Sequence, residues 1–129
     1  MADLVLTRHA ASVKAHLDAL PGAAATLMKN ARSGAPSSLI YKIKGKMFAI
    51  LSVRGAEFVI VKCDPHLAEA LRAKFKGVGH RSHLDKRFWI AMDLDADVPL
   101  KEIKRLASGS YDLARASLPR TLQRELDVR

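Results

Sequence analysis

The stretch from residue 39 to residue 53, Leu-Ile-Tyr-Lys-Ile-Lys-Gly-Lys-Met-Phe-Ala-Ile-Leu-Ser-Val, decides the fold of this chain. Apolar and polar side chains alternate before the glycine-lysine pair, and the second run is apolar except for Ser52. So short a turn joins antiparallel strands. A third apolar run, Phe58–Cys63, follows after the brief segment 54–57. The sequence therefore predicts an antiparallel meander with strands at 39–44, 47–53 and 58–63.

Helical patterns flank this meander on both sides. An apolar stripe at steps of three and four predicts a first helix over 3–20, with Asp3 as its cap and Pro21-Gly22 as its stop. Asp64-Pro65 begins a second helix that runs to Phe75. A last helical region follows Pro99, and Pro119 is expected to end it before a basic tail. Residues 23–29 fit either a helix or a short strand, whereas 33–38 is predicted to be a loop.

A fourth strand is predicted over about 86–94, where the side chains alternate between two faces. Phe88, Ile90, Met92 and Leu94 form the apolar side, and Arg87, Trp89, Ala91 and Asp93 form the other. The resulting order is helix, three strands, helix, strand, helix. It predicts an α+β fold in which helices pack on one face of an antiparallel sheet, as a single domain spanning residues 1–129.

The composition is that of a basic globular protein. Of its 129 residues, 49% are hydrophobic, and 22 Lys and Arg against 13 Asp and Glu give a net charge of +9. Such a surface attracts nucleic acid, anionic lipid or acidic protein, and charge alone does not separate these partners from a simple role in solubility. The single cysteine, Cys63, and the absence of a secretion signal or an apolar run of ~20 residues predict a cytoplasmic protein without a membrane partner.

Basic residues recur on the polar side of the predicted strands. If the apolar sets share the helix-covered face, the open face carries Lys42, Lys44, Lys62, Arg87 and Trp89. Cations beside an aromatic ring can hold phosphates and stack bases, which predicts a nucleic-acid-binding surface. The alternative is that the lysines keep the sheet soluble while Trp89 packs under a loop. A second basic set lies on the last helix and the tail, where it either follows a phosphate backbone or is simply solvated. It consists of Lys101, Lys104, Arg105, Arg115, Arg120 and Arg124.

No motif in the sequence predicts catalysis, a metal or a cofactor. His80, His83 and Asp85 lie close together, but on an extended segment their spacing does not bring them to one side. The glycine pairs lack the other residues of a phosphate loop, and no nucleophile signature is present.

Several segments together resemble the MmcQ/YjbR family in order and spacing. They are Tyr41–Ala49, Val61–Leu71, Leu84–Ile90, Ser110–Leu113 and Leu118–Arg120. The resemblance implies a fold similar to CyaY and a DNA-binding role that rests on the shape of a double wing. The family's tyrosine beside the histidine is absent here, where Arg81-Ser82-His83 stands. Asp3 and Asp18 do not make the acidic ridge with which frataxin-like proteins hold iron, so iron binding is not expected.

The leading prediction is a non-catalytic DNA-binding module in which lysine and arginine neutralise phosphates and Trp89 stacks on a base or sugar. An adaptor that binds an acidic protein through the same face, with Trp89 as anchor, is the alternative. An enzyme acting on an anionic small molecule would instead require a deep pocket with His80, His83 or Cys63 beside a perturbed acid.

Overall fold

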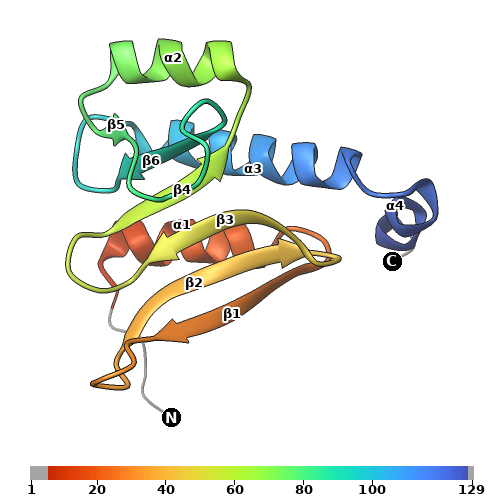
Figure 1. The fold of residues 1–129 in the computed structure, drawn as a ribbon, viewed down its shortest axis with the longest axis horizontal. Coiled ribbons are helices and arrows are strands. Elements are labelled where there is room, and N and C mark those ends of the chain that lie inside the picture. The colour runs from red at the N-terminus through yellow and green to blue at the C-terminus, as the bar shows by residue number, and fades with distance from the viewer. Residues whose placement is uncertain (1–5, 128–129) are drawn as a thin grey trace.

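An antiparallel sheet of six strands, in the order β1-β2-β3-β4-β6-β5, runs through the molecule (Figure 1). The computed structural model describes residues 6–127. Its strands are β1 (Ala23–Lys29), β2 (Pro36–Ile43), β3 (Lys46–Ser52), β4 (Phe58–Lys62), β5 (Val78–Gly79) and β6 (Trp89–Asp93). Its helices are α1 (Arg8–Asp18), α2 (Pro65–Lys74), α3 (Leu100–Ala116) and α4 (Arg120–Asp127). The α+β class and the antiparallel sheet predicted from the sequence are confirmed.

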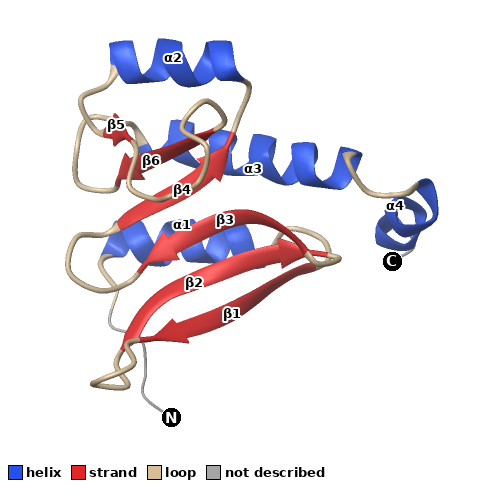
Figure 2. Cartoon of the chain, viewed as in Figure 1, coloured by secondary structure: helices blue, strands red, loops and turns tan. Residues whose placement is uncertain are grey.

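The helices and strands occupy separate layers (Figure 2). Helices α1 and α3 lie behind the sheet, where α3 packs on β3 and β4 and also contacts α1. Helix α2 lies beside the short edge strand β5, and α4 projects beyond the end of α3. The other face of the sheet, called here the outer face, is therefore free of helices.

Local signals start the helices where side chains can satisfy the exposed N–H groups. The Asp64 carboxylate accepts hydrogen bonds from the backbone N–H of His66 and Leu67, as the sequence predicts for α2. The cap of α1 is Thr7, whose hydroxyl accepts from Ala10 N at 3.2 Å. The predicted cap, Asp3, lies outside the described residues.

Three predictions about chain segments were wrong. Residues 36–38 belong to β2 and not to a loop, because β1 forms over 23–29 and pairs Met28 with Ser38. A two-residue strand, β5, follows α2 and pairs with β6, which itself begins at Trp89. The expected basic tail after Pro119 is the helix α4, whose Leu126 is buried. Each of these elements is stabilised by a partner outside its own segment.

The core lies between the sheet and the pair α1 and α3. Tyr41 and Phe48 are fully buried, and the Phe48 ring meets Tyr111 of α3 edge-on, with 5.4 Å between ring centroids. The Tyr41 hydroxyl donates to the Asp18 carboxylate of α1 at 2.7 Å. Burial and this negatively charged partner raise the pKa of Tyr41 well above its usual range, so the phenol stays protonated and keeps α1 attached to the sheet.

No helix among residues 6–127 is both long enough and apolar enough to cross a bilayer.

Candidate nucleic-acid interface

Strands β3 and β4 pair over only part of their length and then separate. Their pairing runs from Leu51 opposite Val59 to Ala49 opposite Val61. Beyond that point the Ser110 hydroxyl of α3 lies between them, where it accepts from Lys62 N at 2.9 Å and donates to Phe48 O at 2.6 Å. One side chain thus satisfies two backbone groups that the sheet leaves unpaired, and a gap opens beside it.

A cluster of cations and aromatic rings stands at the end of β4 that borders this gap. The cationic-aromatic cluster consists of Lys62, Arg87, Phe88 and Trp89. Lys62 lies opposite Trp89 in the β4–β6 pairing, so their side chains share the outer face. The Lys62 ammonium is 5.8 Å from the centre of the Phe88 ring, and the Arg87 guanidinium is 5.4 Å from it. Two positive groups therefore flank one ring.

Backbone hydrogen bonds hold the cluster in position. The Cys63 N–H donates to Phe88 O at 2.7 Å, and the N–H groups of Phe88 and Trp89 both donate to Asp85 O at 3.0 Å. From α2, Arg72 donates to Trp89 O at 3.0 Å and also to Lys86 O. The turn is thus held by hydrogen bonds from both Cys63 and Arg72, so its backbone is fixed. A fixed backbone favours binding without reorganisation.

A small cleft connects the cluster to α3. Its volume is about 110 Å³, and the residues that line it are Lys46, Met47, Lys62, Trp89, Ser110, Leu113, Ala114 and Ser117. The lining contains two lysines and no carboxylate. Leu113 is 45% exposed, which makes it one of few large apolar side chains open to solvent among the described residues.

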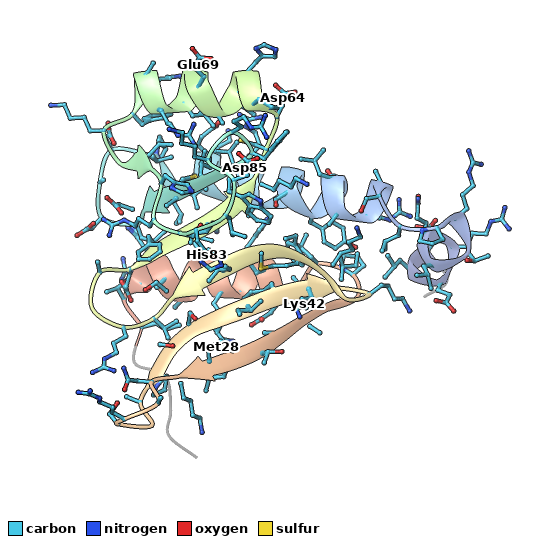
Figure 3. All side chains as sticks on the ribbon, viewed as in Figure 1. Met28, Lys42, Asp64, Glu69, His83 and Asp85 are labelled. Atoms are coloured by element: carbon cyan, nitrogen blue, oxygen red, sulfur yellow. The ribbon has the colours of Figure 1, made fainter. Side chains whose placement is uncertain are left out.

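Three predicted site residues meet in the cluster, and two, Lys42 and Lys44, lie apart from it. Lys62, Arg87 and Trp89 come together, although Arg87 precedes β6 and does not lie on a strand face. Lys42 lies on the outer face of β2, as predicted, but two strands away from β4 (Figure 3). Lys44 is in the β2–β3 turn with a φ of 48° and pairs with Glu125 of α4 at 3.1 Å. Its predicted place on the open face is wrong because the strand ends at Ile43.

The cations of α3 lie on the opposite side of the sheet from the cluster. Lys101 is exposed near the start of α3, and Arg105 pairs with Glu102. Lys104 approaches His16 of α1: burial lowers the pKa of His16, and the positive charge of Lys104 lowers it further. The two predicted basic sets therefore form separate surfaces.

The outer face is less open than predicted, because the loop from 80 to 88 lies over β4 and β6. Arg81 pairs with Asp93 of β6 at 3.1 Å, and its guanidinium is 4.8 Å from the Phe58 ring on β4. Figure 3 shows His83 and Asp85 of this loop in front of the sheet. The accessible part of the outer face is consequently the half formed by β1–β3 together with the cluster.

Sequence reasoning missed Lys46, Phe88 and Leu113. Phe88 was predicted to join Ile90 in the core, but β6 starts one residue later and Phe88 is only partly buried. The sequence places Lys46 in a glycine-lysine turn, and Leu113 lies outside the apolar stripe of the last helix, which consists of Leu100, Ile103, Ala107, Tyr111 and Ala114. The position of Leu113 outside the stripe is the one feature of the sequence that indicates an exposed apolar side chain at this site.

Three carboxylates have a lowered pKa, and of these only Asp85 lies in the turn that carries the cluster. Hydrogen bonds from the Arg87 side chain, then from its backbone N–H, lower the pKa of Asp85 to about 2. Backbone N–H groups of Lys76 and Gly77 lower the pKa of Asp97, and Arg105 lowers that of Glu102. The His80 ring bonds Leu84 O at 2.6 Å, and within residues 6–127 no three metal-ligating side chains gather.

The Asp85–Arg87 pair gives a pH-dependent signal. Because the pKa of Asp85 in the folded protein is depressed, the contact is complete above the ordinary aspartate pKa of ~3.9 and is lost as the pH falls towards 2. An NMR titration of the Asp85 carboxyl carbon is expected to give a midpoint near 2. In Arg87→Ala the midpoint should rise towards ~3.9, though incompletely since the backbone bond stays. Arg105→Ala is the matched control; equal midpoints in all three proteins would contradict the pairing.

Comparisons with known proteins agree with this architecture. Residues 18–113 match the family model YjbR. The chain is 34% identical over 79 residues to the uncharacterized protein YjbR of Escherichia coli K12, and equally to that of strain O157:H7. The aligned region covers 60% of this chain and 67% of each relative.

Solved structures show the same fold. A Deinococcus radiodurans protein with the DUF419 domain superposes with a TM-score of 0.79 at 24% identity, over 92% of this chain and 88% of that one. A Pseudomonas syringae protein superposes with a TM-score of 0.56 at 21% identity, over 70% of this chain and 86% of that one. Since the family model extends from the end of α1 to Leu113, across the sheet, the cluster and the Ser110 bridge, this chain belongs to the YjbR family.

Proposed function

We propose that this protein is a non-catalytic DNA-binding module of the cytoplasm, and that the cationic-aromatic cluster is its contact with DNA. The observation that carries the proposal is the packing of Lys62 and Arg87 about the Phe88 ring, directly beside Trp89. Cations of this kind neutralise phosphates, and the rings offer faces on which bases or sugars stack. Lys46 adds a positive charge at the cleft, and Lys42 adds one on the outer face of β2.

Two further features support the proposal. Asp85, Asp97 and Glu102 have lowered pKa values, whereas a general acid or base needs a pKa near the working pH. The single cysteine, Cys63, is buried and has no second cysteine to pair with, as is usual in a reducing compartment.

An acidic protein is the second candidate partner. The exposed side chain of Leu113 favours it, because an apolar residue beside cations is a common feature of protein interfaces. On this alternative Trp89→Ala abolishes capture of the protein partner and leaves DNA binding unchanged.

A salt series tests the DNA proposal. Trp89 is the only tryptophan, so its fluorescence reports a ligand at the cluster directly. Quenching by DNA is expected, and log affinity should fall with log salt by about 0.9 per phosphate neutralised on a duplex, or about 0.7 on a single strand. Lys62→Ala should reduce this slope by the amount of one phosphate contact, about 0.9 on a duplex or about 0.7 on a single strand, and should weaken binding several-fold.

Lys29→Ala is the matched control, since it removes the same charge from the far end of the β1–β2 hairpin. The combined variant Lys101→Ala, Arg105→Ala tests the prediction that the α3 cations are a second contact. Salt-independent binding, or no binding of either form of DNA at low salt, would refute the proposal.

A further inference from the structure

We infer that the cleft between β3 and β4 receives an unstacked base of single-stranded DNA. The inference rests on the proposed function and makes it more specific. It depends on the gap that Ser110 holds open, because a continuous β3–β4 pairing would leave no entrance beside Trp89.

The size and shape of the cleft argue for one flat group. At about 110 Å³ it is far below the roughly 300–1,000 Å³ of sites that enclose cofactors or drug-sized molecules. Bases inside a duplex are stacked, and proteins read them by inserting a protruding element into a groove. Here the protein is concave, so the base has to enter the protein, which only an unstacked strand permits.

The chemistry of the lining matches a base with its phosphates. Trp89, Met47 and Leu113 provide apolar and aromatic walls, while Lys46 and Lys62 stand among them as cations for the flanking phosphates. Small residues, Ser110 and Ala114, also line the cleft. This is the combination of a stacking surface and a positive groove that single-strand binding uses.

The same lining predicts little preference among bases. The Ser110 hydroxyl donates its proton to Phe48 O, and the Ser117 hydroxyl donates to Ala114 O at 2.7 Å. Neither hydroxyl of the cleft therefore has a donor left for a base edge, since a hydroxyl carries one proton. Binding then depends on stacking, which every base supports.

The test compares a single strand with a duplex of the same sequence at the same salt, using labelled DNA and fluorescence polarisation. The wild-type protein should bind the single strand about tenfold more tightly. Ala114→Leu, which fills the cleft, should remove that preference, a loss of about tenfold that corresponds to one base stack. Ala116→Leu is the matched control, because it makes the same substitution at an exposed position of the same helix.

Leu113→Ala provides an independent variant if Ala114→Leu fails to fold. Leu113 is exposed, so its truncation should leave stability unchanged and weaken single-strand binding several-fold. Equal affinity for both forms of DNA, or an unchanged preference in both variants, would overturn the inference and leave the proposed function standing. Absence of all DNA binding would overturn both. If poly-glutamate bound instead, with the same sensitivity to Ala114→Leu, the cleft would belong to an acidic protein partner.

Discussion

Replacing Phe48 with alanine is expected to reduce the free energy of unfolding by about 3–5 kcal/mol. The ring is completely buried between Tyr41 and Tyr111, with centroid distances of 6.2 and 5.4 Å, and it joins the sheet to α3. Truncation removes its apolar contacts and leaves a cavity that the rigid sheet and helix cannot close. For a domain of this size such a loss is a large fraction of the total stability, and the variant is expected to be marginally folded at 37 °C.

Urea unfolding followed by circular dichroism measures this effect. Phe88→Ala is the matched control, because it makes the same chemical change at a partly exposed ring outside the core. The control should lose much less stability while binding DNA more weakly. Equal losses in both variants would contradict the assignment of Phe48 to the core and of Phe88 to the surface cluster.

Ser110→Ala is expected to destabilise the protein by about 1–3 kcal/mol for each backbone group it leaves unpaired. The hydroxyl serves two such groups, Lys62 N at 2.9 Å and Phe48 O at 2.6 Å, and it is 1% exposed, so water does not readily replace it. Alanine fits the space without a clash, which means that the cost reflects lost hydrogen bonds and not poor packing. Amide hydrogen exchange at Lys62 should accelerate markedly, since its N–H loses its acceptor.

Ser108→Ala makes the matched comparison on the same helix. The Ser108 hydroxyl bonds the His16 ring at 2.7 Å and is only partly buried, so its loss should cost less. If Ser110→Ala were as stable as Ser108→Ala, with unchanged exchange at Lys62, the serine would not hold β3 and β4 apart. The origin proposed for the cleft would then be wrong.

The sequence alone predicts an element correctly where its local pattern agrees with its tertiary environment. The alternation at Leu39, Tyr41 and Ile43 survives in the structure as the buried face of β2, because period-2 burial is a property of any strand with one covered face. The pair Asp64-Pro65 begins α2 as predicted, since a cap acts within one helical turn.

For Phe88, the alternating pattern of the fourth strand gave a wrong prediction. Its apolar character fits the alternation with Ile90, yet Asp85 O accepts from Phe88 N and Trp89 N and makes a turn just before the strand. The alternation therefore stops one residue early, and the ring joins Lys62 at the surface. A strand boundary depends on hydrogen bonds that periodicity does not contain.

By itself, the sequence determined the α+β class, the antiparallel meander, the positions of the main helices and the positive charge, because these follow from local periodicity, caps and composition. Only the tertiary structure decided which cations share a surface, that α4 forms after Pro119, and that a cleft opens between β3 and β4. The reason is physical: each of these depends on contacts between residues far apart in the chain. Ser110 meets Lys62 across 48 positions and Phe48 across 62, and no local pattern encodes such a meeting.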